Sequence, residues 1–329
     1  MAASPTPRPT PDSVAPPPAV AALQALAPSL PVAVAFSGGA DSTALLVAAQ
    51  RVWPGQIHAV HIHHGLQADA DGFERQCRAT CQALDVPLYV LPVNARHRAG
   101  ESPEDAARKA RYTALAEAAI ALRVTSVLLG QHADDQVETM LLALSRGAGL
   151  PGLAAMPARF ERHGMQFHRP FLKLSAAALR AWLVQEAIAF VDDPMNADPA
   201  YTRSRIRQDI LPALEGAFPQ FRETFARSAR HAAQAQELLT ELALADLALI
   251  GSPPDIRLLR RLSRGRQANA LRHWLRSAHG AAASAAQLEE LLDQVAACST
   301  RGHAIRMKVA AGRVELRDAT LRYVTSAGD

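Results

Sequence analysis

The amino-acid sequence predicts an α/β fold: a mainly parallel sheet with helices on both faces, followed by a smaller, mainly helical C-terminal domain. Three observations support this prediction. Short apolar runs of strand length alternate with segments of helical period up to about residue 145. A glycine-rich turn joins the first apolar run to the first helical segment. A chain of 329 residues is also too long for one ordinary domain.

Four strand–helix pairs make up the predicted sheet. The predicted strands are Val32–Phe36, Ile57–His63, Leu88–Val93 and Val124–Gly130. The helices that follow them are expected over Thr43–Gln50, Ala68–Leu84, Glu104–Leu122 and Asp134–Ser145. Strands joined by helices of this length run parallel, because the chain crosses back before each new strand. Ligands of such sheets bind where the strands end and the helices begin.

The second part of the chain has a different pattern. A helix is expected over Ser175–Ala187, and from about Phe218 the chain is nearly all helical until about Ala297. Ile305–Val324 alternates apolar and polar residues, which predicts a small terminal hairpin.

The domain boundaries follow from composition and from these patterns. Residues 1–18 hold seven of the 22 prolines and almost no large apolar side chains, so we expect a disordered tail there. The boundary between the folded domains is expected near Ala213–Pro219. The sequence then predicts a ligand-binding α/β domain over residues 19–215 and a basic, mainly helical domain over residues 216–329.

The composition excludes several classes of protein. Hydrophobic residues make up 49% and charged residues 20%, which is the balance of a globular protein. No apolar run approaches the roughly 20 residues that span a bilayer, and no secretory signal is evident. The three cysteines, Cys77, Cys81 and Cys298, lack the spacing of a disulfide framework. We therefore expect a cytoplasmic protein with no membrane partner.

The excess of positive charge is confined to the second part of the chain. The net charge is +4, but residues 200–329 contain 19 Lys and Arg against 13 Asp and Glu, a surplus of +6. Seven arginines lie within 20 residues that contain no acidic side chain: Arg257, Arg260, Arg261, Arg264, Arg266, Arg272 and Arg276. Such a run is often a solvated helix face, but seven bases without an acid favour contact with nucleic-acid phosphates. A second basic cluster comprises Arg203, Arg205 and Arg207.

The sharpest local motif, between the first predicted strand and helix, is Ser37-Gly38-Gly39-Ala40-Asp41-Ser42. Its glycines allow a tight turn and let backbone N–H groups approach an anion, and its serines add hydroxyl donors. The positive end of the following helix points at the same place. The carboxylate of Asp41 would repel a phosphate unless a divalent cation lay between them, and Mg²⁺ is the natural candidate. The alternative is a turn that uses its glycines for geometry alone.

At these residues the sequence resembles the PP-loop ATP pyrophosphatases, which cleave ATP, adenylate a substrate oxygen and release pyrophosphate. Four later segments narrow the resemblance. They are His61–Leu66, Glu101–Arg108 with Arg111 and Tyr112, His132–Thr139 running on to Arg146 and Gly147, and Asp193–Asn196 followed by Tyr201 and Arg203–Arg207. Over about residues 32–215 the chain is therefore similar, in this order, to the tRNA(Ile)-lysidine synthases.

The resemblance implies a Rossmann-like sheet of the PP-loop type that binds ATP. The loop Ser37–Ser42 and His64 would contact the nucleotide, and Asp41 would hold Mg²⁺. Where Gln131 stands in this chain, the family usually has a second histidine before His132.

The resemblance also implies a site for free L-lysine. Asp135 and Glu138 are three residues apart and share a helix face, where they would hold the ammonium group. Arg111 would pair with the lysine carboxylate, and His132 would contact the reacting phosphate. From the residues alone, Asp135 and Glu138 could equally bind a metal or form a solvated acidic first turn.

The activity implied is a ligase that joins lysine to the wobble cytidine of the CAU anticodon of an isoleucine tRNA. Single-stranded anticodon recognition would fit the basic residues. The expected tRNA contacts are Arg203, Arg205, Arg207, Arg257, Arg260, Arg261 and Arg264.

Two alternatives stay open. One is a tRNA thiolase of the same superfamily, although such relatives usually need a CxxC pair and this chain has only Cys77 and Cys81 in CxxxC spacing. The other is a non-catalytic RNA-binding protein that retains the fold. The sequence leaves the oligomeric state open, a homodimer included.

Overall fold

The computed structural model describes residues 15–63, 70–93, 103–192, 198–298 and 304–325. The chain divides into two compact units, Met1–Ala229 and Arg230–Asp329. The first 14 residues of the predicted tail lie outside the described residues, and so do His64 and the segment Asp193–Asn196. No described helix is both long and apolar enough to cross a lipid bilayer.

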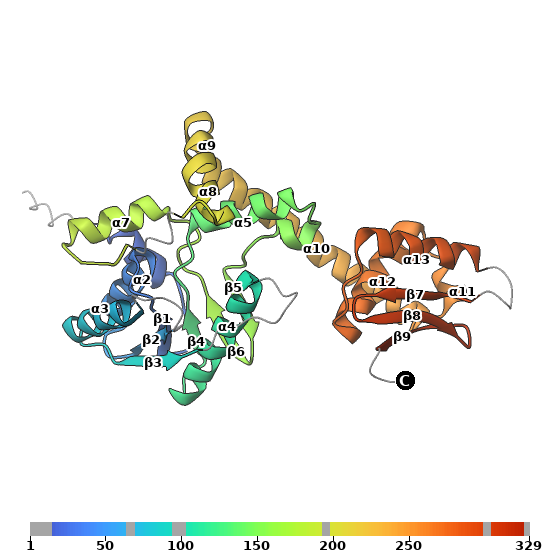
Figure 1. The fold of residues 1–329 in the computed structure, drawn as a ribbon, viewed down its shortest axis with the longest axis horizontal. Coiled ribbons are helices and arrows are strands. Elements are labelled where there is room, and N and C mark those ends of the chain that lie inside the picture. Colours follow the sequence, from blue (N-terminus) through green and yellow to red (C-terminus); the bar gives the residue numbers. More distant parts are fainter. Residues whose placement is uncertain (1–14, 64–69, 94–102, 193–197, 299–303, 326–329) are drawn as a thin grey trace, which may run out of the picture. The chain divides into compact units, whose positions relative to one another are not determined.

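A six-stranded sheet forms the centre of the first unit (Figure 1). Its order is β3-β2-β1-β4-β6-β5, and all neighbours are parallel except β5, which pairs antiparallel with β6. The strands are β1 (Val32–Ala35), β2 (Ile57–His63), β3 (Leu88–Pro92), β4 (Ser126–Leu128), β5 (Arg159–Arg162) and β6 (Met165–His168). The predicted α/β fold and its four parallel strands are confirmed.

The hairpin β5–β6 is not predicted by the sequence. Each strand has only four residues, and three of the four in β5 are charged, so any apolar pattern is too short to mark the strands. His163 and Gly164, both with positive φ, form the tight turn between the strands. The hairpin extends the sheet beyond β4 and brings Arg169 to its carboxyl edge.

Helices cover both faces of the sheet because its strands are apolar on both sides. On β1, Val32 and Val34 pack into one hydrophobic core, whereas Ala33 packs into another. The first core includes residues of α1 (Pro18–Gln24), α2 (Ala40–Val52), α3 (Ala70–Ala83) and α7 (Ala176–Gln185), and the second includes residues of α4 (Pro103–Ala121).

The strand order reverses between β1 and β4. The chain continues from β1 to β2 and β3 on one side, and from β4 to β6 on the other. In parallel sheets such a reversal opens a crevice at the carboxyl ends of the two strands. Helix α2 begins there after β1, and α5 (Ala133–Ser145) begins there after β4. The short helix α6 (Leu150–Leu153) follows α5 in the chain. The first turns of α2 and α5 therefore face the same crevice.

The segment after α7 folds back onto α5. It comprises α8 (Thr202–Arg205), the π-helical turn η2 (Ile206–Ile210), α9 (Leu211–Ala217) and the start of α10 (Phe221–Ile250). A small apolar core joins Ile206, Leu211 and Phe221 of this segment to Val137 and Leu142 of α5. This core holds the arginines of α8 and η2 beside the first turns of α5.

The second unit is mainly helical and ends in a small antiparallel sheet. After α10 its elements are α11 (Ile256–Leu259), α12 (Arg264–His279), α13 (Ala285–Ala297), β7 (Arg306–Val309), β8 (Gly312–Arg317) and β9 (Thr320–Thr325). Where the sequence predicts a two-stranded hairpin, the structure has three strands in the order β7-β8-β9. Asp318 and Ala319 form the second turn with positive φ, so no glycine marks it in the sequence.

A buried ion pair joins two helices of the second unit. Asp246 of α10 is fully buried, and both of its carboxylate oxygens accept hydrogen bonds from Arg266 of α12. Arg264, at the start of α12, instead pairs with Glu289 and Asp293 at the surface. Two arginines of the run that lacks acids in the sequence, Arg264 and Arg266, thus meet acids from other helices in the fold.

We expect Arg266→Ala to lower the free energy of unfolding more than Arg264→Ala does. The first change leaves a buried carboxylate without its cation, whereas exposed ion pairs contribute little to stability. Urea unfolding followed by circular dichroism measures both variants against the parent chain. Equal losses would contradict the structural role of Arg266.

Candidate active site

The phosphate-loop motif forms a closed turn between β1 and α2. The N–H of Ser37 donates to Oγ of Ser42 at 3.2 Å, and that hydroxyl donates to the carbonyl of Gly39 at 3.0 Å. Gly39 is the N-cap of α2 and offers no side chain to the first turn of the helix. The N–H groups of that turn are therefore available to an anion in the crevice.

Two glycines let the loop lie close to its neighbours. Gly38 has a φ of +86°, and a Cβ there would lie 3.1 Å from Sγ of Cys77. Gly130 follows β4, and a Cβ there would lie 3.2 Å from the carbonyl carbon and oxygen of Asp41. Both contacts are tighter than ordinary Cβ contacts, so a larger side chain would force a neighbour to shift.

Asp41 has the geometry expected of a cation ligand. Its Oδ1 is buried and has no hydrogen-bond partner among the described residues, while its Oδ2 lies 3.5 Å from Nε2 of His132. A buried carboxylate oxygen without a partner is costly unless a ligand satisfies it, and a hard cation such as Mg²⁺ fits this oxygen. In the described part of the chain, no group of three or more His, Cys, Asp or Glu could hold a metal ion. Phosphate or water oxygens would therefore complete such a site.

His132 caps α5 and is surrounded by carboxylates. It is 3% exposed, and its backbone N–H donates to Asp135 at 3.1 Å. Burial lowers the pKa of His132, but the hydrogen bond to Asp41 and the charges of Asp135, Asp41 and Asp134 outweigh burial and raise this pKa to about 9. The ring is then an imidazolium at neutral pH and has no acceptor for the N–H of Asp135, which lies 3.4 Å from Nδ1.

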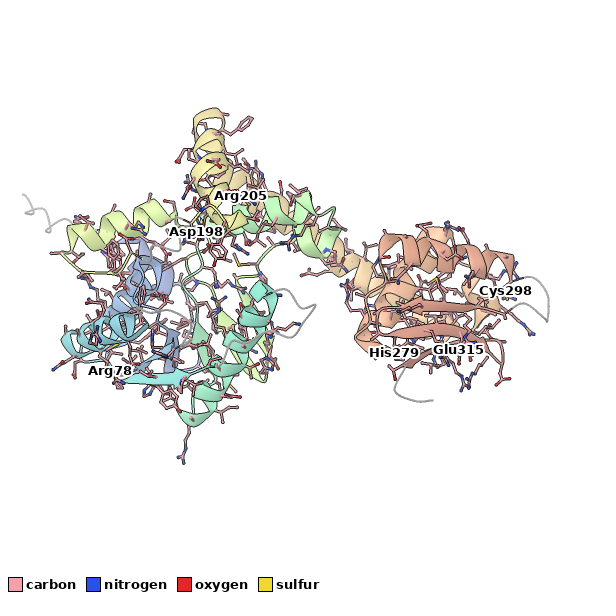
Figure 2. The ribbon with its side chains drawn as sticks, in the orientation of Figure 1. Arg78, Asp198, Arg205, His279, Cys298 and Glu315 are labelled. Carbon is pink, nitrogen blue, oxygen red and sulfur yellow. The ribbon has the colours of Figure 1, made fainter. Side chains whose placement is uncertain are left out.

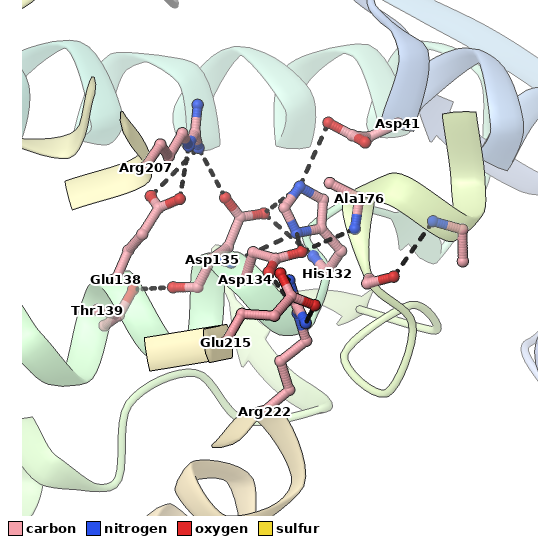
Figure 3. A network of polar contacts seen from close by, with 12 residues as sticks. Asp41, His132, Asp134, Asp135, Glu138, Thr139, Ala176, Arg207, Glu215 and Arg222 are labelled. Carbon is pink, nitrogen blue, oxygen red and sulfur yellow. Dashed lines mark hydrogen bonds and ion pairs between the residues drawn. The ribbon is translucent and has the colours of Figure 1, made fainter. Parts of the chain in front are cut away.

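Asp135 and Glu138 share a face of α5, and Arg207 of the following segment contacts both (Figure 3). Arg207 donates through Nε to Glu138 at 2.5 Å and through Nη2 to Asp135 at 3.0 Å. Arg203 lies 3.3 Å from Glu138. Burial raises the pKa of Glu138, while its hydrogen bond to Arg207 acts in the opposite direction. Two residues expected to contact tRNA thus pair with the two expected to hold lysine.

Arg169 is a site residue that the sequence does not reveal. Its buried guanidinium donates to Gln131 at 3.0 Å, to the carbonyl of Pro157 at 2.7 Å and to the hydroxyl of Tyr112 at 2.9 Å. The guanidinium carbon also lies 4.3 Å from the ring centroid of Phe160. Arg169 follows the unpredicted strand β6, so no pattern in the sequence marks it. It joins the helix that carries Arg111 to the loop that precedes His132.

These elements enclose one large cleft of about 2480 Å³ in the first unit. Of the predicted site residues, it is lined by Ser37, Gly39, Ala40, Asp41, Ser42, Arg111, His132, Asp135, Arg203 and Arg207. Glu138 is fully buried behind this surface, and Arg205 is exposed outside it (Figure 2). The cleft thus joins the phosphate loop to one carboxylate and the arginine of the predicted lysine site.

The predicted tRNA contacts of the second unit differ in their surroundings. Arg257 and Arg261 are exposed. Arg260 donates to the carbonyl of Cys298 at 2.6 Å, and Arg264 has two acidic partners. The carbonyl of Cys298 is neutral, so Arg257, Arg260 and Arg261 keep their charge for a polyanion, whereas two acids balance the charge of Arg264.

We expect Gly38→Ala to reduce ATP binding and stability more than Gly55→Ala does. Both glycines have positive φ, so both substitutions carry backbone strain of about 1 kcal/mol. A Cβ at Gly38 would also lie close to Sγ of Cys77, whereas nothing lies within 4 Å of a Cβ at Gly55. Thermal unfolding and nucleotide titration of both variants test this, and matching losses would show that the Cys77 contact is unimportant.

Comparisons with known proteins identify the family to which the chain belongs. The family described as PP-loop domain matches residues 19–214, and the family described as TilS substrate binding domain matches residues 255–319. The tRNA(Ile)-lysidine synthase of Polaromonas naphthalenivorans (strain CJ2) is 64% identical over 299 residues, which cover 91% of either chain. That of Burkholderia mallei (strain ATCC 23344) is 43% identical over 94% of this chain, which spans 64% of that relative's length.

Among solved structures, the U34-tRNA thiolase NcsA from Methanococcus maripaludis has the same fold in part. Its TM-score is 0.55 at 16% sequence identity, over 65% of this chain and 76% of that one. At this identity the likeness concerns the fold alone. The family matches and the closely similar relatives carry the assignment: the chain belongs to the tRNA(Ile)-lysidine synthase family.

Proposed function

We propose that the chain is an ATP-dependent ligase that joins free L-lysine to C2 of the wobble cytidine in the CAU anticodon of an isoleucine tRNA. The reaction passes through an adenylated cytidine and yields lysidine, AMP and pyrophosphate. The proposal places the enzyme in the cytoplasm. The main support is that the phosphate loop, His132 and Asp135 line one cleft in a chain of this family.

The loop residues account for the first step. The N–H groups at the start of α2, together with Ser37 and Ser42, would hold the phosphates of ATP. Mg²⁺ on Asp41 would neutralise charge on the phosphate oxygens. His132, whose Nε2 lies 3.5 Å from Oδ2 of Asp41, would contact the reacting phosphate. These groups stabilise charge and fix position, which supply most of the catalysis in phosphoryl chemistry.

The residues in the first turns of α5 would bind lysine for the second step, in which its amine attacks the adenylated cytidine. Asp135 and Glu138 would hold the lysine ammonium, and Arg111, which lines the same cleft, would pair with the lysine carboxylate. The ε-amine has to lose its proton before it attacks C2 and displaces AMP. Holding the amine beside the activated cytidine makes this step effectively unimolecular.

The thiolase alternative is disfavoured by the cysteines. Burial raises the pKa of Cys77 to about 12 and that of Cys81 to about 11, so both stay protonated thiols at neutral pH. The third cysteine, Cys298, belongs to the other unit. A non-catalytic RNA-binding role leaves the partnerless oxygen of Asp41 and the uncapped start of α2 without an explanation.

Incubation of the full chain with ATP, labelled L-lysine and isoleucine tRNA tests the proposal. We expect label in the tRNA only when ATP is present, with pyrophosphate released. Asp41→Ala should slow pyrophosphate release by about 10²–10³-fold, the usual cost of one such electrostatic group. Glu186→Ala, which removes an exposed carboxylate paired with Arg51, is the control. RNA binding without label transfer would contradict the ligase.

We further propose that tRNA contacts the exposed arginines of the second unit and Arg205 of the first. Phosphate contacts of this kind release counterions, so they set the salt dependence of binding. Whether the active form is a homodimer stays a prediction.

The double variant Arg260→Ala, Arg264→Ala should weaken tRNA binding and reduce its salt slope by about one for each arginine that binds a phosphate. Arg257→Ala with Arg261→Ala should weaken binding at least as much, since no described carboxylate pairs with either residue. Filter binding at several salt concentrations measures both. Unchanged affinity in both doubles would mean that this surface is only a solvated face.

A further inference from the structure

The two carboxylates proposed for lysine are already occupied by a cation of the chain. Arg207 donates to Oε1 of Glu138 at 2.5 Å, to its Oε2 at 3.2 Å and to Oδ1 of Asp135 at 3.0 Å (Figure 3). One guanidinium thus spans the pair that the proposed function assigns to the lysine ammonium. The other oxygen of Asp135 already accepts from the backbone N–H of His132.

Charge balance disfavours the simultaneous binding of Arg207 and a lysine ammonium to this pair. Glu138 is completely buried, and the arginines that contact it are Arg207 and Arg203. A third cation at these carboxylates would lie beside like charges in a poorly solvated place, which is unfavourable. A lysine that binds there therefore has to take the place of a guanidinium.

The surroundings of Arg207 would allow its guanidinium to leave Asp135 and Glu138. Its side chain is 36% exposed and lines the cleft, whereas Glu138 does not line it. On the cleft side, an incoming amine meets Arg207 and Arg203, which both contact Glu138. Arg207 lies on the π-helical turn η2, and such turns are rare and often occur at functional sites.

The same cleft offers a second partner to the displaced guanidinium. Arg207 is within electrostatic range of Asp41, so the phosphate-loop side of the cleft is near. Phosphates held there would attract the displaced arginine. Nucleotide and lysine would then each favour the conformation that the other needs.

We propose that Arg207 is a displaceable counter-ion of the lysine site: it occupies Asp135 and Glu138 until the lysine ammonium replaces it, and it then turns toward the nucleotide phosphates. This inference rests on the proposed function, because it takes Asp135 and Glu138 as the lysine carboxylates. Arg207 acts on lysine by competition and is a positioning residue for the nucleotide. Lysine affinity thereby depends on whether nucleotide is bound.

Calorimetric titration of the full chain with L-lysine, with and without a non-hydrolysable ATP analogue, tests the inference. We expect the parent chain to bind lysine more tightly when the analogue is present. Arg207→Gln should tighten lysine binding without nucleotide by about tenfold or more, because a site vacant in at most about a tenth of the molecules weakens apparent affinity by that fraction. The same variant should lose most of the effect of the analogue.

Three further measurements make the test decisive. Arg207→Lys keeps a cation but loses the fork, so it should tighten lysine binding less than Arg207→Gln does. Arg51→Gln removes a forked arginine–glutamate pair outside the cleft and should leave lysine binding unchanged. Circular dichroism confirms that each variant is folded. Weaker lysine binding in both Arg207 variants, or an unchanged effect of the analogue, would overturn the inference.

Glu138→Gln separates this inference from the proposed function. Loss of lysine binding in Glu138→Gln without tightening in Arg207→Gln would leave the lysine site in place and refute displacement alone. Unchanged lysine binding in Glu138→Gln would refute the assignment of the lysine site itself, and displacement with it.

Discussion

Buried carboxylates at the start of α5 impose the constraint on which the rest of the first unit depends. Asp134 is 5% exposed and Glu138 is fully buried, and a buried carboxylate without a cation is strongly unfavourable. Asp134 meets Arg222 of α10 at 2.6 Å and accepts from the N–H of Ala176 at the start of α7. Glu138 meets Arg207 of η2. Three elements that come later in the chain thus converge on one helical turn because its charges have to be balanced.

The ion pairs that hold this part of the fold together also occupy the carboxylates that are proposed to bind lysine. The cations that balance α5 come from the segment Thr202–Arg222, which a small apolar core holds in place. Any cationic substrate that binds to α5 competes with that arrangement, and any anionic substrate draws cations from it. A site of this kind therefore couples its ligands electrostatically even when they do not touch each other.

The parts of the fold that sequence predicts are those with a local signal. The four predicted strands are runs of strand length between helical segments, and the phosphate loop has glycines at fixed positions between a strand and a helix. By contrast, β5 and β6 have only four residues each, three of those in β5 are charged, and the last turn of the second unit contains no glycine. The ion pairs are still harder to predict from the sequence, because Arg207 and Glu138 are 69 residues apart in the chain. Local spacing places Asp135 and Glu138 on one face but says nothing about the cation that reaches them.

The contacts that each arginine makes in the fold also decide how much positive charge it offers to a ligand. In sequence, Arg266 belongs to a basic run, yet in the fold it neutralises Asp246 and adds little to a polyanion site. Arg169 differs from Arg266 because it pairs with no carboxylate among the described residues. Its hydrogen bonds go to Gln131, Pro157 and Tyr112, which are all neutral acceptors. Burial lowers its pKa, but an arginine starts from so high a value that it stays charged. Its charge is therefore not cancelled locally and contributes to the potential of the cleft. A count of bases along the chain cannot separate these two cases, because the difference lies in what each guanidinium contacts.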